Sequence, residues 1–322
     1  MQLLDPNLKT IEVTNDVGDT VCHVLDSDMV NAVNAALAIN RPLLIWGEPG
    51  IGKSQLVKAV AKELSRPFLH FVADARTEAR DLLWHFDAVA RLAEAQLNRN
   101  PAPQGEADPL AIENFIVPGV MWWALNWESA QKMAKQCKRK EPDIAGRKVE
   151  NGVVVLIDEI DKADTDVPNG LLEALGSSRF HPQGLDEPVT CCGQKPLVMI
   201  TTNEERSLPD AFLRRCLSLH LSFPAESGEQ QAFLVKRAEQ NAAYFPELNT
   251  AVFTEAAAML VEDRQYAKGR GFYPLPGQAE YFDMLRGIQR LSQQTSKPAT
   301  DYIKELRTFT YQKHPGFHAE RT

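Results

Sequence analysis

The sequence predicts an α/β protein in which helices sandwich a parallel sheet and a small, purely helical domain follows. Two observations support this prediction. Short apolar runs, separated by helical or loop sequence, recur along the first two thirds of the 322-residue chain, as in a doubly wound sheet. Such runs cease after Phe223-Pro224, where the pattern becomes helical. We therefore expect an α/β domain at residues 1–224, with insertions near 75–125 and 127–150, and an α-helical lid domain at 225–322.

The individual elements follow from hydrophobic spacing. Residues 28–40 and 54–64 repeat apolar side chains at helical intervals, and they flank an apolar run at 42–46 that suits a buried parallel strand. Four further strands are expected at 68–72, 153–157, 197–201 and 217–221. Helices are expected in the last third at 230–239, 253–261 and 278–291.

Composition and charge limit the expected binding partners and location of the protein. The formal net charge of −8 does not favour wrapping of nucleic acid or of an anionic membrane. The five cysteines form no CxxC pair, so we expect reduced thiols. No stretch approaches 18 consecutive apolar residues and the first residues lack a leader pattern, so we expect no membrane insertion and a cytoplasmic location.

A phosphate-binding pattern lies between the predicted strand at 42–46 and the helix after it. Residues 47–54 match G-x-x-x-x-G-K-[ST], in which backbone N–H groups surround phosphate oxygens at a helix N-terminus. Lys53 would reach the β- and γ-phosphates and Ser54 would ligate Mg²⁺. The alternative is a glycine-rich turn that binds nothing. The expected nucleotide-binding residues are Gly47, Glu48, Pro49, Gly50, Ile51, Gly52, Lys53 and Ser54.

A pair of carboxylates ends the apolar run at 153–157. Because such a strand opens at the carboxyl edge of a parallel sheet, Asp158 suits a role at Mg²⁺, and Glu159 is placed to orient or deprotonate the attacking water. The alternative is that the two acids only solvate the end of a strand. With the phosphate loop, the pair predicts ATP and Mg²⁺ as cofactors, although the sequence does not distinguish adenine from guanine.

In this order the motifs resemble those of AAA+ ATPases, and among them the MoxR branch, over most of the chain. The resemblance implies a P-loop AAA+ core and makes Asn203, after the strand at 197–201, the polar sensor that positions water beside Glu159. It also makes Arg215 the arginine finger donated to a neighbouring subunit, with Arg214 as the second choice. In the helical domain Gln278 matches the second sensor, where the family usually has arginine.

The resemblance also identifies two insertions. The segment from 75 to 124 takes the place of an insert that faces the ring pore, where Trp122 and Trp123 would grip a substrate or, alternatively, pack in the core. Residues 177–193 resemble a hairpin before the sensor strand, which would bring Phe180 and His181 near the pore or a partner. Lys268 and Arg270 are alternatives to Gln278 as second sensor.

Three functions are compatible with these motifs. The resemblance implies a ring, hexameric in the family, that hydrolyses ATP to remodel a client, with a von Willebrand A domain protein as partner. A nucleic-acid-dependent ATPase is the second possibility, because residues 132–150 carry seven basic and three acidic side chains, a balance of 7 − 3 = +4. The third is a nucleotide-gated scaffold with little turnover. The basic residues behind the second possibility are Lys132, Lys135, Lys138, Arg139 and Lys140.

Overall fold

The structure, a computed structural model, describes residues 2–14, 18, 20–97, 108–295 and 297–319. It divides into two compact units. The first comprises residues up to 8 together with 27–46 and 57–219, and the second comprises 9–26, 47–56 and 220–322.

A five-stranded sheet forms the centre of the first unit. Its strands are β3 (Leu43–Gly47), β4 (Phe68–Val72), β7 (Val154–Asp158), β10 (Leu197–Thr202) and β11 (Leu217–Leu221). They lie in the order β11-β3-β10-β7-β4, and β3, β10, β7 and β4 are parallel to their neighbours. The structure thus confirms the predicted parallel sheet. Two strands, β4 and β11, have the bounds expected from sequence.

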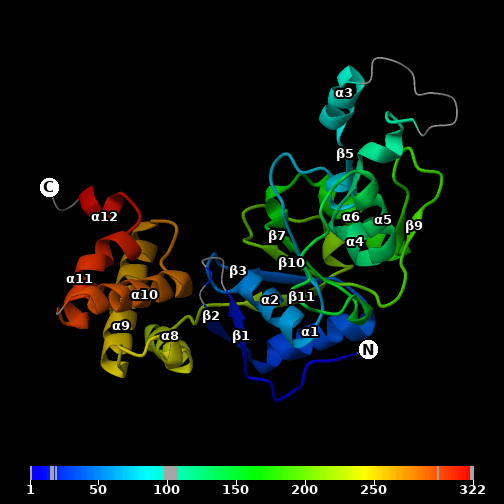
Figure 1. The fold of residues 1–322 in the computed structure, drawn as a ribbon. Coiled ribbons are helices and arrows are strands. Elements are labelled where there is room, and N and C mark those ends of the chain that lie inside the picture. Colours follow the sequence, from blue (N-terminus) through cyan, green and yellow to red (C-terminus); the bar gives the residue numbers. More distant parts are fainter. Residues whose placement is uncertain (1, 15–17, 19, 98–107, 296, 320–322) are drawn as a thin grey trace. The chain divides into compact units, whose positions relative to one another are not determined.

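Helices cover both faces of this sheet. Alternate strand residues point to opposite faces, so a strand that is apolar throughout needs a cover on each side. Figure 1 shows α1 (Ser27–Ile39) and α2 (Lys53–Glu63) on one side of the strands, and α4 (Val120–Leu125), α5 (Trp127–Gln136) and α6 (Asp166–Ser177) on the other. The core beneath the second group includes Val155, Ile157, Val198 and Ile200. Both sheet faces are therefore buried, as a near-continuous apolar strand requires.

The expected insert begins after β4 and contains short elements. They are η1 (Ala79–Leu82), β5 (Trp84–Phe86), α3 (Ala88–Leu97), η2 (Ile112–Phe115) and β6 (Ile116–Pro118), with β5 antiparallel to β6. Trp122 and Trp123 on α4 are only 1% and 5% exposed. The suggestion that these tryptophans grip a substrate is therefore wrong, and their alternative role in core packing holds.

Smaller elements complete the first unit. They are η3 (Val149–Asn151), η4 (Ile160–Lys162), β8 (Arg179–Phe180), β9 (Val189–Thr190) and α7 (Asp210–Leu213). Strands β8 and β9 pair as a hairpin within the segment expected to form one. Phe180 packs edge-on against Trp122, with ring centroids 5.7 Å apart, so this side chain covers the core of its own unit.

Helices dominate the second unit. They are α8 (Ser227–Gln240), η5 (Ala242–Tyr244), α9 (Thr250–Arg270), α10 (Gln278–Gln294), α11 (Ala299–Thr310) and α12 (Gly316–Ala319). An antiparallel ribbon, β1 (Thr10–Thr14) with β2 (Thr20–Val24), belongs to the same unit. Neither this ribbon nor α11 is among the elements expected from sequence. No helix in the described ranges has the length and apolar character needed to cross a membrane.

Candidate functional site

The phosphate loop, residues 47–54, runs from the end of β3 into α2. Gly50 and Gly52 have φ values of +78° and +102°, which side-chain-bearing residues rarely adopt. A Cβ on Gly50 would lie 2.9 Å from the Cβ of Ala279, and one on Gly47 would lie 2.4 Å from the carbonyl oxygen of Leu221. Glycine is thus required at position 50 by both backbone conformation and close packing, at position 52 by conformation and at position 47 by close packing.

Lys53 is the first residue of α2 and is 7% exposed. Its Nζ donates to the carbonyl oxygens of Gly47 at 2.5 Å and of Glu48 at 3.1 Å. The ammonium group is thereby held over the loop that precedes the helix. Ser54 follows in the first turn and is half-buried.

Two buried polar side chains flank Gly52. A Cβ there would lie 3.5 Å from Cε1 of His23 and 3.7 Å from Nε2 of Gln278. Neither His23 Nε2 nor Gln278 Oε1 has a hydrogen-bond partner in the described part of the chain. Burial, with a smaller contribution from the charge of Arg237, lowers the pKa of His23 to about 3, so the imidazole is neutral at pH 7.

The structure therefore places Gln278 beside the phosphate loop, at the start of α10. The two alternatives for this position, Lys268 and Arg270, lie in the last turn of α9 and are exposed. Arg270 sits over the ring of Tyr266, 5.1 Å from its centroid.

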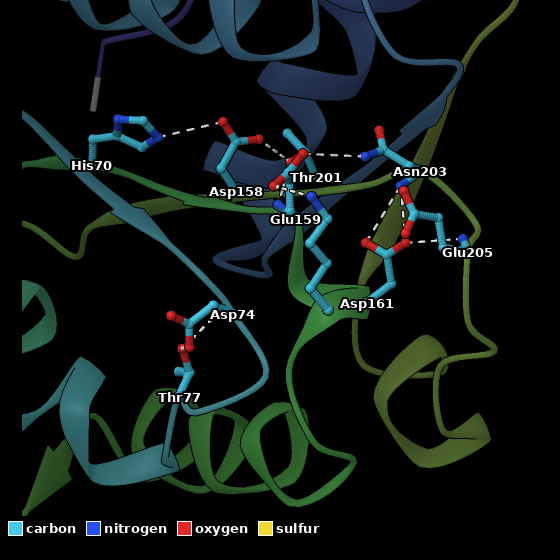
Figure 2. A network of polar contacts seen from close by, with 10 residues as sticks. His70, Asp74, Thr77, Asp158, Glu159, Asp161, Thr201, Asn203 and Glu205 are labelled. Atoms are coloured by element: carbon cyan, nitrogen blue, oxygen red, sulfur yellow. Dashed lines mark hydrogen bonds and ion pairs between the residues drawn. The ribbon is translucent and has the colours of Figure 1, made fainter. Parts of the chain in front are cut away.

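A second group of polar residues lies at the carboxyl ends of β7 and β10 (Figure 2). Asp158 ends β7 and accepts a hydrogen bond from the hydroxyl of Thr201 on β10. Its other carboxylate oxygen lies 3.3 Å from Nε2 of His70 on β4. Neighbouring strands on both sides thus fix the orientation of this carboxylate.

Glu159 follows in a left-handed conformation with φ +58°, which is unusual for a residue with a side chain. Its backbone N–H donates to Thr201 Oγ1 at 2.9 Å. Its carboxylate accepts from Lys162 Nζ at 2.7 Å and from Asn203 Nδ2 at 3.4 Å. The hydrogen bond to Glu159 raises the pKa of Lys162. Glu159 and Asn203 are thus brought together, as expected.

Asp161 supports the segment after β10. Its side chain is 2% exposed and accepts hydrogen bonds from the backbone N–H groups of Asn203 at 3.3 Å and Glu205 at 3.0 Å. In Figure 2 its carboxylate lies between these two residues. The position of Asn203 therefore depends on a buried carboxylate as well as on its own strand.

The two candidate finger arginines directly follow α7. Arg214 and Arg215 are both exposed, and neither forms an ion pair with any residue that the structure describes. Their guanidinium groups are not part of the cluster around Glu159.

Basic side chains of the segment 132–150 are in part paired with acids. Lys132 lies 2.8 Å from Glu128, and Arg139 pairs with Asp87. Part of this segment is the helix α5, in which Ala130 and Ala134 are buried. The local excess of positive charge is thus smaller than the sequence count indicates.

Several residues of these two groups were not expected from sequence. Thr201 could have been noticed, because it immediately precedes the Thr-Asn pair that ends the sensor strand. Lys162 stands three residues after Glu159, a spacing that brings side chains together in a helical turn. His23 and His70 carry no such signal.

The family that the sequence matches agrees with this fold. Residues 43–224 match the family described as ATPase family associated with various cellular activities (AAA). Similar solved structures include a Cytophaga hutchinsonii protein assigned as an ATPase, at 12% identity and TM-score 0.42 over 89% of this chain and 81% of that chain. A point mutant of Thermotoga maritima RuvB is similar at 15% identity and TM-score 0.46 over 88% and 68%. No curated protein matches the sequence.

The family match spans more than half of the chain, so the protein belongs to the AAA family of ATPases. It is an ATPase. Members of this family use nucleotide, usually with Mg²⁺, and generally assemble into rings.

Proposed function

We propose that this chain is a Mg²⁺-dependent ATPase of the MoxR type, which acts as a ring and remodels or switches a partner protein. The observation that carries the catalytic part is the strand order. Strand β10, which Asn203 follows, lies between β3, which the phosphate loop follows, and β7, which ends in Asp158. Parallel strands end at one edge of a sheet, and ligands of open α/β sheets bind outside that edge.

The phosphate loop has features suited to a nucleotide. Gly47 and Gly50 leave no room for a Cβ, and beside Gly52 two buried polar atoms, His23 Nε2 and Gln278 Oε1, have no partner among the described residues. Buried polar groups are normally satisfied, so such atoms are candidates for ligand contacts. We assign Lys53 to the β- and γ-phosphates, Ser54 and Asp158 to Mg²⁺, and Gln278 to the nucleotide. The metal ion would neutralise charge on the phosphate oxygens.

Glu159 and Asn203 are assigned to the attacking water. Glu159 is the general base, and Asn203, whose amide reaches the Glu159 carboxylate, orients both the base and the water. Lys162 Nζ donates to one carboxylate oxygen of Glu159 and so occupies a position that the water would need, so hydrolysis requires that this contact loosen. Arg215, or else Arg214, would stabilise the phosphoryl group held by the next subunit.

The partner protein is inferred from the resemblance to MoxR proteins, which implies a von Willebrand A domain protein as client. The helical segment 225–322 acts as the lid in this proposal. Pairing of Lys132 and Arg139 with acids weakens the case for nucleic acid as the activating partner.

Two variants test the catalytic assignment. Lys53→Ala should lose ATP binding, measured by titration of a fluorescent ATP analogue, whereas Glu159→Gln should bind ATP and fail to release phosphate. Unchanged affinity in Lys53→Ala would exclude residues 47–54 as the phosphate site. Near-normal turnover in Glu159→Gln would transfer the role of base to Asp161.

The Glu159→Gln variant also tests the partner. Held in ATP, it should retain a client protein during purification, and mass spectrometry should identify a von Willebrand A domain protein. Lys53→Ala, which cannot enter the ATP state, is the matched control. Equal recovery of that protein with both variants would contradict nucleotide-dependent remodelling.

A further inference from the structure

A cavity of about 210 Å³ opens in the first unit, at the edge of the sheet where β10 begins. Its polar lining residues are Asn40, Arg66, Gln194 and Lys195. Arg66 lies two residues before β4, and Lys195 lies two before β10. Asn203 follows the opposite end of β10, and Asp158 lies at the same end of β7, which is parallel to both strands. A strand length of roughly 15–20 Å therefore separates the cavity from them.

The floor of the cavity holds a buried charge. Arg66 is 1% exposed, and its Nε and Nη1 have no hydrogen-bond partner in the described ranges. None of the residues lining the cavity is acidic. Burial lowers the pKa of Arg66, and no neighbouring carboxylate offsets this effect. An uncompensated guanidinium is costly to bury, so an anion that neutralised it would bind with a gain in free energy.

The surrounding backbone makes room for this guanidinium. Gly152 has φ +88°, and a Cβ there would lie 3.3 Å from Nη1 of Arg66 and 3.3 Å from the carbonyl oxygen of Lys195. A second cation lies close by, because Nη1 of Arg147 reaches the carbonyl oxygen of Arg66 at 3.5 Å. Burial also lowers the pKa of Arg147, although the charge of Asp143 acts in the opposite direction.

The rim adds a third positive charge and polar donors. Lys195, Asn40 and Gln194 are exposed, so their side chains are available to a ligand entering from solvent. The volume far exceeds the roughly 30 Å³ that one water molecule occupies in the liquid. The cavity thus has space, a buried cation and accessible donors together.

We propose that this cavity binds a small oxyanion, a phosphate or a carboxylate, with Arg66 at its base and Lys195 at its rim. A guanidinium presents its N–H groups as a planar fork that matches two oxygens of such an anion. The site is distinct from the phosphate loop, and binding there does not require ATP hydrolysis.

Isothermal titration with inorganic phosphate tests the site without interference from the nucleotide loop when it is done on the Lys53→Ala variant. Saturable binding of phosphate should remain in Lys53→Ala. Adding Lys195→Gln should weaken it about tenfold, and adding Arg66→Met should abolish it. Absence of saturable binding in Lys53→Ala, or equal affinity after Arg66→Met, would overturn the proposal.

Thermal unfolding provides the second readout and controls for folding. Arg66→Met removes the buried charge while keeping a long side chain, so without phosphate its Tm should equal or exceed that of the parent. Phosphate should raise the Tm of the parent more than that of Arg66→Met, because general salt stabilisation acts on both. An equal rise in both proteins would contradict the site.

The ligand class is tested with acetate and chloride at matched ionic strength. Acetate should compete with phosphate, because it offers the same pair of oxygens. Chloride, which cannot use the fork, should compete at least about tenfold less well. Equal competition by chloride would show a site for charge alone and would contradict an oxyanion site.

Discussion

Arg264 on α9 donates from one guanidinium nitrogen, Nη2, to both carboxylate oxygens of Glu48 in the phosphate loop, at 2.7 and 2.6 Å. Its Nη1 donates to the carbonyl oxygen of Pro276 at 2.9 Å, and the guanidinium lies 4.7 Å from the ring centroid of Phe223. The Arg264 side chain is 8% exposed and that of Glu48 is 50% exposed. A helix of the C-terminal region therefore holds the loop that precedes Lys53.

We expect Arg264→Met to weaken ATP binding about tenfold and to lower Tm. The loop would lose its anchor, and the charge of Glu48 would be left unpaired beside the expected phosphates. Titration of a fluorescent ATP analogue measures the affinity. Glu48→Gln is the matched control, since it removes the charge but keeps a hydrogen-bond acceptor, and its effect should be smaller. Wild-type affinity in Arg264→Met would show that the contact does not support the loop.

Asp161→Asn should reduce ATP turnover about tenfold to a hundredfold and leave ATP affinity near its normal value. The reason is geometric: an amide NH₂ would replace one of the oxygens that accept the backbone N–H groups of Asn203 and Glu205, so the segment carrying Asn203 would shift. Phosphate release at saturating ATP measures the effect. Asp186→Asn, an exposed carboxylate in the β8–β9 hairpin, is the control and should be silent. A fall in ATP affinity equal to the fall in turnover would argue against a positioning role.

Arg215→Ala should leave each subunit able to bind ATP while the site that it completes in the neighbouring subunit stops hydrolysing, because the guanidinium would act across the subunit boundary. Its exposure and its lack of an ion pair within the described residues are compatible with that role. Mixing is the decisive measurement. Subunits with Glu159→Gln keep Arg215, and Arg215→Ala subunits keep Glu159, so mixed rings contain junctions where both intact groups meet and ATP is hydrolysed.

Activity of the mixture no greater than the mean of the two variants, with co-assembly verified by light scattering, would count against Arg215 as a trans finger. Arg214→Ala, tested in parallel, identifies the correct arginine. Recovery with Arg214→Ala but not with Arg215→Ala would show that Arg214 is the finger.

Stability should fall in mild acid because of His23. Burial holds its pKa at about 3, whereas an unfolded histidine titrates near 6.5. Between these values the unfolded state binds the proton more readily, so the contribution of His23 is present above about pH 6.5 and is lost as pH falls toward 3. The loss amounts to at most about 1.4 kcal/mol per pH unit.

Urea unfolding at pH 7, 6 and 5, followed by circular dichroism, measures this dependence. His23→Gln should flatten it, because the amide does not titrate. The exposed His85→Gln should behave like the wild type. A dependence of equal steepness in His23→Gln would show that other groups are responsible for it.

Local sequence was sufficient to predict the strands of the sheet and some of the residues in each of the two polar groups. The run at 68–72 is apolar enough to identify β4 within its actual bounds, and the spacing within 47–54 identifies Lys53 from neighbouring residues alone. Strand β7 ends one residue later than expected. Asp158 continues the ladder opposite Val72, and that pairing depends on another strand.

What sequence could not provide depends on distant partners. Glu48 and Arg264 are 216 residues apart, so no spacing rule connects them. The two strands of the ribbon, with sequences TIEVT and TVCHV, contain polar residues between the apolar ones, so neither forms a continuous apolar run that identifies a strand. Helix α11 buries only Tyr302 and Ile303 and is held to α9 by the contact of Arg307 with Asp263, at 2.8 Å. Its apolar pattern was therefore weak.

The division of the chain into two units also separates its chromophores. All five tryptophans lie between residues 46 and 127, in the first unit, whereas all six tyrosines lie between 244 and 311, in the second. Tryptophan emission excited at long wavelength therefore reports on the first unit, which contains the sheet. The tyrosine bands of the near-ultraviolet spectrum report on the second, helical unit. Melting of either unit can consequently be followed by its own optical signal in the unlabelled protein.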